Sequence, residues 1–231
     1  MADISEINEN QLLDFFTGKN ILITAGPTRE KIDDVRFISN FSSGKMGFAL
    51  AEKTKHYGAN VTLISGPVNL LPPEDVELIN VESAEDMYLA SVNLFPKTDI
   101  AIMTAAVADY TPINQFKGKL KKEQLGDEAV IKLKKTKDIL AELSRRRTNN
   151  QTVVGFALES TDELEYGRNK LIDKACNMIV INSANKPDSG FGGNKNTISI
   201  ISEKGFRKSY QPMLKSECAV EILKAISFYN H

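Results

Sequence analysis

The stretch RFISNFSSGKMG, residues 36–47, joins two apolar segments near the beginning of the chain. The segment before it, Ile21 to Ala25, is rich in β-branched residues and is predicted to form a buried strand. The segment after it carries an apolar stripe to about Tyr57 and is predicted to form a helix, which Ser42 or Ser43 would cap. A helix start attracts anions, because its N–H groups are unpaired and its dipole is positive there. The stretch therefore predicts an α/β fold with an anionic ligand at this junction.

The connection between this strand and this helix is unusually long. It covers residues 26–42, whereas such loops usually take about two to six residues. The run AGPTRE supplies only one glycine, and Gly44-Lys45 is followed by Met46, so the sequence has neither GxGxxG nor a P-loop here. The connection also carries five polar side chains that a simple connector would not need: Arg29, Asp33, Asp34, Arg36 and Asn40.

The composition fits one large α/β domain over residues 1–231, or one domain with a sizeable appendage. The chain has 29 basic and 30 acidic residues, and this balance argues against a general nucleic-acid binder. The first residues are polar and no apolar run approaches the roughly 20 residues of a spanning helix, so neither signal peptide nor membrane anchor is expected. Cys176 and Cys218 are isolated, which predicts reduced, buried thiols in a cytoplasmic protein. His56 and His231 lie far apart, so histidine chemistry is not expected.

Strand-like and helix-like segments alternate along the chain. This order predicts right-handed crossovers and a mostly parallel sheet with helices on both faces. The predicted strands after the first cover residues 61–65, 76–81, 99–104, 153–158, 178–182 and 197–202, with a glycine-rich turn over residues 189–196. A short helix is expected within residues 1–19, and later helices are predicted to start at Ser83 with a cap from Asp86, at Thr136, at Ser160 with a capping box to Glu163, and near Ser216.

The run AAVAD, Ala105 to Asp109, follows the fourth predicted strand. Small residues at the carboxyl end of a strand allow a ligand to approach the backbone, and ligands of open α/β sheets bind at that edge. Alanines that merely pack against a helix explain the same composition equally well.

The periodicity then breaks over residues 110–135, which are rich in lysine. VIKLKK and GKLKKE alternate apolar and charged residues, and this predicts an antiparallel hairpin outside the main sheet. Most of these lysines are expected to be solvated and to protect a sheet edge, but one is expected to contact an anionic ligand. Lys170 and Lys174 share one face of a predicted helix, where surface charge is the simplest explanation.

Six strings together resemble the phosphopantothenate–cysteine ligases. They are TAGPTREKIDDVRFISNFSSGKMG, AAVADY, GKLKK, KDIL, GFALES and INSAN, in the order and spacing of that family from Asn20 onward. The resemblance implies a Rossmann-like fold, a homodimer, and CTP with Mg²⁺ for the joining of 4′-phosphopantothenate to L-cysteine. About twenty residues precede the first strand, so a stand-alone bacterial type is expected rather than a fusion with a decarboxylase. The insertion 110–135 would act as a flap and dimerisation element.

The resemblance also implies roles for individual residues. Asn40 would hold the acyl-nucleotidylate, Lys119 would be the catalytic lysine of the flap, and Arg36 and Ala105 would contact substrate. Asp109 would contact the nucleotide and could touch Mg²⁺, while Asn182 matches an asparagine with no assigned role. The remaining nucleotide-site residues implied by the family are Met103, Thr104, Lys137, Asp138, Ile139, Leu140, Phe156, Lys170 and Lys174, with Lys137 at a position where relatives often carry a different residue.

Three alternatives remain from the sequence. Eukaryotic relatives use ATP, so an ATP-dependent version of the same ligase is one of them. A short-chain dehydrogenase is another: Tyr166 and Lys170 have the spacing Tyr-x-x-x-Lys, although Tyr110 is followed four residues on by Asn114, and the glycine fingerprint is missing. A nucleotide sensor without catalysis, or a subunit that regulates a decarboxylase, is the third.

Overall fold

The computed structural model of the protein describes residues 4–121, 128–183 and 193–230. Its centre is an eight-stranded sheet. The six strands from β10 to β5 are parallel, whereas β12 pairs antiparallel with β10, and β13 pairs antiparallel with β12. The strand order is β13 (Arg207–Ser209), β12 (Ile198–Ser202), β10 (Met178–Ser183), β9 (Thr152–Glu159), β6 (Ile100–Met103), β1 (Asn20–Ala25), β4 (Asn60–Ser65) and β5 (Glu77–Asn80). This confirms the predicted α/β fold and puts the topological switch point between β1 and β6.

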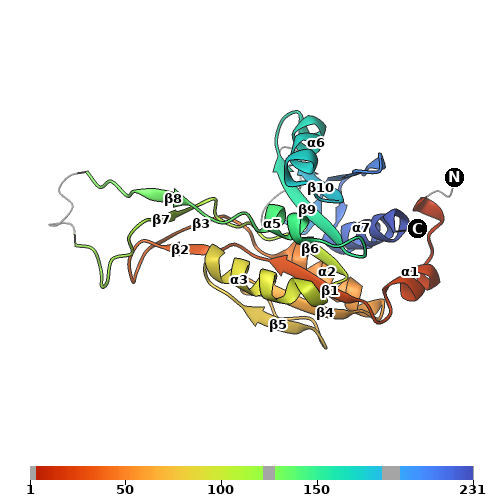
Figure 1. Ribbon diagram of the computed structural model, residues 1–231, viewed down its shortest axis with the longest axis horizontal. Helices are drawn as coiled ribbons and strands as arrows, with labels where there is room; N and C mark the ends of the chain where they lie inside the picture. Colours follow the sequence, from red (N-terminus) through yellow and green to blue (C-terminus); the bar gives the residue numbers. More distant parts are fainter. Residues whose placement is uncertain (1–3, 122–127, 184–192, 231) are drawn as a thin grey trace.

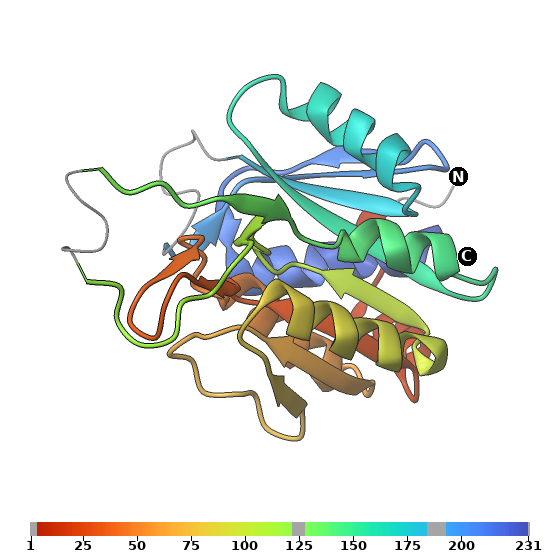
Figure 2. The ribbon, with the colours of Figure 1, turned by 60° about the vertical axis from the view of Figure 1, so that its left-hand side comes forward.

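Helices cover both faces of the sheet, as predicted. One face carries α1 (Glu9–Phe16), α2 (Lys45–His56) and α7 (Lys215–Tyr229), and the other carries α3 (Ala84–Leu94), α5 (Ile139–Arg146) and α6 (Glu163–Lys174), which Figure 2 shows side by side. Within β1, Ile21 and Ile23 join the first core cluster and Leu22 joins the second, because successive strand side chains point to opposite faces. Two short 3₁₀ helices, η1 (Ile4–Glu6) and η2 (Phe95–Lys97), flank α1 and α3.

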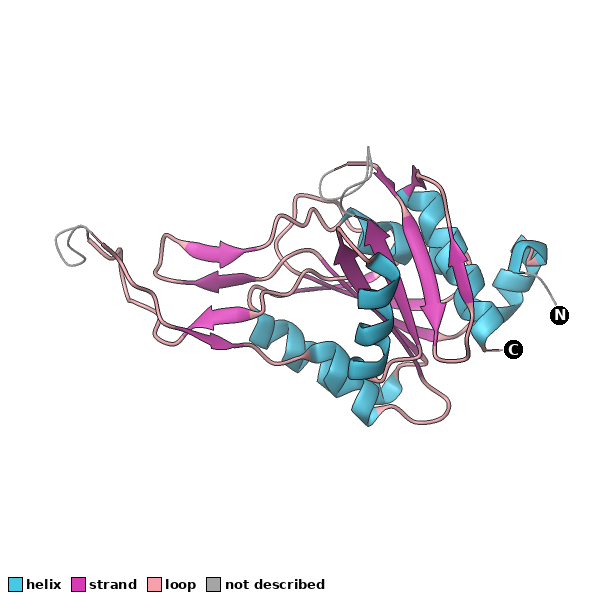
Figure 3. Ribbon diagram, turned by 90° about the horizontal axis from the view of Figure 1, so that it is seen from above, coloured by secondary structure: helices cyan, strands magenta, loops and turns pink. Residues whose placement is uncertain are grey.

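Two antiparallel hairpins project together from one end of the molecule (Figures 1 and 3). The first consists of β2 (Arg29–Lys31) and β3 (Phe37–Ser39), and the second of β7 (Tyr110–Pro112) and β8 (Leu133–Lys135). We call these two hairpins, residues 29–39 and 110–135, the arm.

The arm confirms one prediction and corrects two others. The second hairpin lies outside the main sheet as expected, with Tyr110 paired to Lys135. The segment 26–42 is not only a polar loop, because its ends pair as β2 and β3. The strand predicted for GKLKKE is wrong over residues 118–121, whose backbone groups instead form hydrogen bonds to the turn of the first hairpin. The last two residues of this string lie outside the described ranges.

The starts of four helices test the predicted caps. Ser83 and Asp86 form the expected capping box of α3. For α2 the prediction was wrong, because the N-cap is Gly44, whose φ of 77° is left-handed, and no side chain caps the helix. The Ser42 hydroxyl instead accepts a hydrogen bond from the Gly44 amide (3.3 Å), just before the helix begins.

The other two helix starts also differ from the prediction. α5 begins at Ile139 rather than at Thr136, because the carboxylate of Asp138 accepts a hydrogen bond of 2.9 Å from the Ala141 amide. Thr136 donates its hydroxyl to the Ala108 carbonyl instead (2.7 Å). α6 begins at Glu163 without a side-chain cap, so the predicted capping box from Ser160 is wrong.

The C-terminal part adds a small second sheet. β11 (Lys195–Asn196) pairs antiparallel with β14 (Met213–Leu214) just before α7. The predicted glycine-rich turn over 189–196 lies outside the described residues up to 192, and its end forms β11. In the part of the chain that the structure describes, none of the helices is both long and apolar enough to span a membrane.

Candidate functional site

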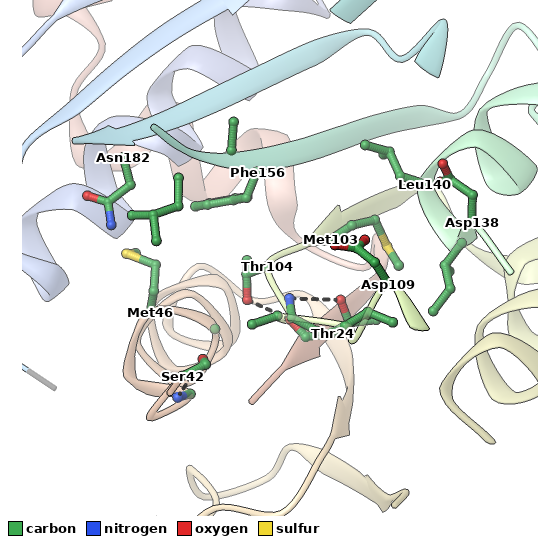
Figure 4. Close-up of a pocket in the computed structure, with 18 of the residues that line it drawn as sticks. Thr24, Ser42, Met46, Met103, Thr104, Asp109, Asp138, Leu140, Phe156 and Asn182 are labelled. Carbon is green, nitrogen blue, oxygen red and sulfur yellow. Dashed lines mark hydrogen bonds between the residues drawn. The ribbon is translucent and has the colours of Figure 1, made fainter. Parts of the chain in front are cut away.

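A cavity of about 700 Å³ opens at the carboxyl ends of β1, β6, β9 and β10. Its lining comes from the end of β1 and β6, the start of α2, the start of α5, one face of α6, and the ends of β9 and β10, as Figure 4 shows for Thr24, Met103, Met46, Asp138 and Phe156. The cavity therefore lies at the topological switch point, where ligands of open α/β sheets bind.

The segment after β6 forms the floor of the cavity and is held by β1. The Thr104 hydroxyl donates to the Thr24 carbonyl (2.6 Å), and the Ala105 amide donates to the Thr24 hydroxyl (3.3 Å; Figure 4). The Ala106 amide donates to the Gly26 carbonyl (2.9 Å). Small side chains and fixed backbone together leave room for a ligand against this floor, so the alanines of AAVAD do more than pack a helix.

Asn40 connects the first hairpin to this floor. Its amide nitrogen donates to the carbonyls of Ala106 (2.9 Å) and Val107 (3.2 Å). Asn40 therefore helps to fix the backbone of residues 105–109, the segment that ends at Asp109.

The start of α2 lies directly against the strand ends. A side chain on Gly47 would place a Cβ 2.5 Å from the Ala25 Cβ and 2.6 Å from the Thr104 hydroxyl. Glycine at this position lets the first turn of α2, with its unpaired N–H groups, reach the cavity wall. The residues from Ser42 to Gly47 all line the cavity.

The cavity is strongly basic. Among its described lining residues, lysines outnumber aspartates six to two, so their side chains give a formal charge of +4. The lysines are Lys45, Lys135, Lys137, Lys170, Lys174 and Lys215, and the aspartates are Asp109 and Asp138. A cavity of this charge fits a polyanion such as a nucleoside triphosphate.

Lys170 and Lys174 both face this cavity from α6. Burial lowers the pKa of Lys170 below its ordinary value, although the Glu159 carboxylate partly opposes that shift. Lys174 is paired with the Asp138 carboxylate that caps α5. An anion that entered beside Lys170 would replace lost hydration with a charge partner, so this lysine is prepared for an anionic ligand.

Lys137 and Lys215 lie on other walls of the cavity. The Lys137 ammonium pairs with Glu85 (2.6 Å) and lies over the Tyr88 ring, 4.5 Å from its centroid. Lys215 is 8% exposed and donates to the Gly193 carbonyl (2.5 Å). Its pKa is lowered mainly by burial and also by the positive charge of the nearby Lys45. Positive charge thus reaches deep into the cavity from α7 as well.

Two asparagines offer acceptors inside the cavity. The side-chain oxygens of Asn182 and Asn196 are buried and have no hydrogen-bond partner within the described residues. Asn196 is only 3% exposed, and its amide nitrogen contacts the Met46 sulfur at 3.7 Å. Buried acceptors without a partner are costly unless a ligand or water donates to them.

Comparison with known proteins identifies the family. The family model described as "DNA/pantothenate metabolism flavoprotein C-terminal domain" matches residues 16–229, which is nearly the whole chain. The chain belongs to this family. The Rossmann-like fold expected from the resemblance to phosphopantothenate–cysteine ligases is confirmed.

Individual members of the DNA/pantothenate metabolism flavoprotein family are close in sequence. Coenzyme A biosynthesis bifunctional protein CoaBC of Bacillus subtilis (strain 168) is 45% identical over 211 residues, which cover 91% of this chain and 51% of that protein. A cysteine/cysteine sulfinic acid decarboxylase from an unknown prokaryotic organism is 46% identical over 215 residues, which cover 93% of this chain and 59% of that protein. The chain thus spans between about half and three fifths of the length of these relatives.

One solved structure of the family resembles the whole chain. The crystal structure of the C-terminal domain of coenzyme A biosynthesis bifunctional protein CoaBC is 43% identical, with a TM-score of 0.78. The match covers 92% of this chain and 95% of that domain. The chain therefore has the fold of that C-terminal domain.

The structure gathers most of the predicted site residues around one cavity. Eleven of them line it: Met103, Thr104, Ala105, Asp109, Lys137, Asp138, Ile139, Leu140, Phe156, Lys170 and Lys174. Asn182, which had no predicted role, lines it too. By contrast, Tyr166 of the dehydrogenase pattern is 52% exposed and is not part of the lining, so this pattern does not form a pair in the cavity.

Three predicted residues lie outside the cavity lining. Asn40 contacts the floor through its bonds to the Ala106 and Val107 carbonyls. Arg36 and Lys119 lie on the arm, where the Arg36 guanidinium is bonded to Asp33 rather than directed at the cavity.

Other residues of the cavity could not be singled out from the sequence. Lys45 was part of a rejected P-loop pattern, Asn196 was predicted only as the end of a glycine-rich turn, and Lys215 lies outside every quoted motif. Only the packing of β11 and α7 against α2 brings these two residues to the cavity. The Gly44-Lys45-Met46-Gly47 run was the one local signal for this wall.

Proposed function

We propose that the protein is a ligase that joins 4′-phosphopantothenate to L-cysteine and gives 4′-phosphopantothenoylcysteine, in coenzyme A biosynthesis. CTP would activate the acid and be converted to CMP and pyrophosphate. The observation that carries the proposal is the strongly basic cavity at the switch point, in a chain of this family. The CoaBC relatives are named as coenzyme A biosynthesis proteins, which points to the same pathway.

The chemistry explains why so much positive charge is needed. A carboxylate does not acylate an amine, because its oxygen is a poor leaving group. In the first step the pantothenate carboxylate oxygen attacks the α-phosphorus of CTP, and the bond to pyrophosphate breaks. In the second step the cysteine amine attacks the acyl carbon, loses a proton and releases CMP. The first step brings two anions together, so cations and oriented dipoles must stabilise its transition state.

The residues of this chain divide that work between binding and stabilisation. Lys170, Lys174 and the start of α2 face the phosphates, and Phe156 lies beside the base. At about 4 Å a lysine and a phosphate oxygen attract by about 4 kcal/mol at an effective dielectric near 20. Lys119 supplies a further cation to the reacting phosphate, and Asn40 holds the acyl-cytidylate together with the floor.

Mg²⁺ fits this site as an ion held mostly by the phosphates. Of the two carboxylates in the described cavity lining, Asp138 is paired with Lys174, so Asp109 is the one that offers an oxygen ligand. The described residues contain no group of three or more His, Cys, Asp or Glu able to hold a metal by themselves. When bound, Mg²⁺ would neutralise phosphate charge, which suits an ion that keeps most of its water and phosphate ligands.

We assign CTP as the nucleotide and keep ATP as the alternative. Cytosine and adenine both carry an exocyclic amino group, and the unpartnered oxygens of Asn182 and Asn196 are acceptors for such a donor. Uracil has no such group, so UTP should be a poor substrate.

The proposal extends to assembly and location. We propose that residues 1–231 act as one nucleotide-binding domain in a homodimer, with the arm in the interface. Support comes from its exposed apolar side chains: Val130 is 85% exposed, and Val35, Phe37 and Ile113 are between 46% and 59% exposed. The buried free thiols of Cys176 and Cys218 support a reducing, cytoplasmic setting.

One experiment tests the activity directly. Pyrophosphate release is measured with CTP, ATP or UTP, with and without phosphopantothenate and cysteine. We expect release that requires phosphopantothenate and is fastest with CTP, and we expect Lys119→Gln to suppress it. Release that is independent of phosphopantothenate, or no release with any nucleotide, would reject the ligase.

A further inference from the structure

The two hairpins of the arm are joined at one place. The turn of the first hairpin, residues 32–36, lies against residues 116–120 of the second. The Phe116 amide donates to the Ile32 carbonyl (3.0 Å), and the Asp34 amide donates to the Gly118 carbonyl (3.4 Å). These segments are more than 80 residues apart in the sequence.

Asp33 is the centre of this junction. It is 2% exposed, and one carboxylate oxygen accepts from the amides of Val35 (2.9 Å) and Arg36 (2.7 Å). The other oxygen accepts from the Arg36 guanidinium (2.5 and 3.1 Å) and from the Leu120 amide (3.0 Å). The Arg36 guanidinium also holds the pKa of Asp33 well below its usual range, so the carboxylate stays ionised near neutral pH.

The contacts across this junction enclose Lys119 on both sides. On one side, the Gly118 amide donates to the Asp34 carboxylate (2.7 Å). On the other side, the Leu120 amide donates to Asp33, and the Leu120 carbonyl accepts from the Arg36 guanidinium (2.9 Å). The backbone is thus fixed immediately before and after Lys119, while its side chain is exposed.

We propose that Asp33, Asp34 and Arg36 form a clamp that positions Lys119 for the transfer of the nucleotidyl group. The inference rests on the proposed function, because Lys119 is the cation that this function requires on the arm. It gives Arg36 a positioning role in place of the direct substrate contact that the resemblance implied.

The physical basis is preorganisation. A lysine on a loose hairpin would have to lose backbone freedom each time it met the reacting phosphate. Charge-assisted hydrogen bonds to the neighbouring peptides, one of them to the buried Asp33 carboxylate, restrict that freedom beforehand. Gly118 helps by adopting a left-handed φ of 73°, which turns its amide to Asp34.

A double-mutant cycle tests whether the clamp acts through Lys119. The variants are Asp34→Ala, Lys119→Gln and the pair, with kcat and KM for pyrophosphate release measured for each. We expect Asp34→Ala to lower kcat roughly tenfold in the wild-type background and to change the KM for CTP less than about twofold. In the Lys119→Gln background, measured with enzyme in excess, the same change should lower the rate less than about twofold. An equal loss in both backgrounds would overturn the proposal.

A second measurement separates the clamp from the reaction. Hydrogen exchange of the Gly118 and Leu120 amides should be slow in the wild type, and Asp34→Ala should speed exchange at Gly118 at least tenfold. Glu128→Gln removes a carboxylate from the same hairpin outside the clamp and should change neither exchange nor kcat. Fast exchange in the wild type would show that no clamp exists. A wild type that exchanges slowly but releases no pyrophosphate would reject the proposed function and with it the role of the clamp.

Discussion

Lys170 illustrates at the level of a single residue how binding and stability oppose each other. Burial lowers its pKa from the ordinary value of 10.5, because the charged form loses hydration. Between the folded-state pKa and 10.5 the unfolded chain binds more protons than the folded one, so stability rises with pH in that window. At pH values below this window Lys170 is charged in both states, and the full cost of burying its charge destabilises the folded protein. A bound polyanion would reverse this cost.

Lys170→Met should therefore stabilise the free protein and weaken its binding of CTP. We expect the unfolding midpoint to rise by about 2–4 °C, the shift that about 1 kcal/mol produces in a domain of this size. The affinity for CTP should fall about tenfold or more. Lys174→Met is a matched control on the same helix, because it breaks the ion pair with Asp138 and should not raise the midpoint. Calorimetry and CTP titration measure both, and a lower midpoint for Lys170→Met would contradict the argument.

Asn40 is the second residue whose chemistry can be isolated. Asn40→Asp replaces the amide donor with a carboxylate that would face the carbonyl oxygens of Ala106 and Val107. Repulsion should move the floor of the cavity, and the added charge would lie near an anionic intermediate. We expect product formation to fall about a hundredfold. Asn93→Asp makes the same change on the exposed surface of α3 and should have no effect; a normal product yield from Asn40→Asp would refute the role.

At the level of the elements, the position of the start of α2 depends on Gly47 having no side chain. Gly47→Ala should push the helix away from β1 and β6, because its Cβ would meet Ala25 at 2.5 Å. Overpacking of this kind costs about 1–3 kcal/mol, and the displaced N–H groups should weaken CTP binding severalfold. Ala49→Gly lowers stability through helix propensity by about 1 kcal/mol, without touching the strand ends. If both variants bound CTP equally well, α2 would not form part of the nucleotide site.

At the level of the whole molecule, the arm exposes apolar side chains that a single copy leaves in water. The exposed residues Ile113 and Val130 lie on the second hairpin, away from both core clusters. Figure 1 shows the arm extending well beyond the sheet. A second copy packed on the arm would remove this surface from water.

Sedimentation should accordingly give twice the 25.6 kDa of one chain. Ile113→Asp with Val130→Asp should shift the population to monomers, because it places two charges in the apolar surface. Leu71→Asp is the control, since Leu71 is 92% exposed but lies on the loop before β5, away from the arm. A wild type that sediments as a monomer at micromolar concentration would refute the proposed interface.

Most of the α/β framework could be predicted from the sequence, because strand and helix periodicities are local. The apolar run of β1, the capping box at Ser83 and the apolar stripe of α2 each act over a few residues. Helix starts were less predictable. Asp138 outcompetes Thr136 as a cap because Thr136 bonds to Ala108, a partner 28 residues away.

The sequence by itself therefore determined the order of strands and helices, the carboxyl edge where a ligand would bind, and, through family resemblance, eleven of the residues that line the cavity. Only the tertiary structure decided that Asp33 holds the peptide beside Lys119, and that Lys215 and Asn196 reach the cavity. The physical reason is distance along the chain. Residues that are more than 80 positions apart meet through packing, and no local pattern records that meeting.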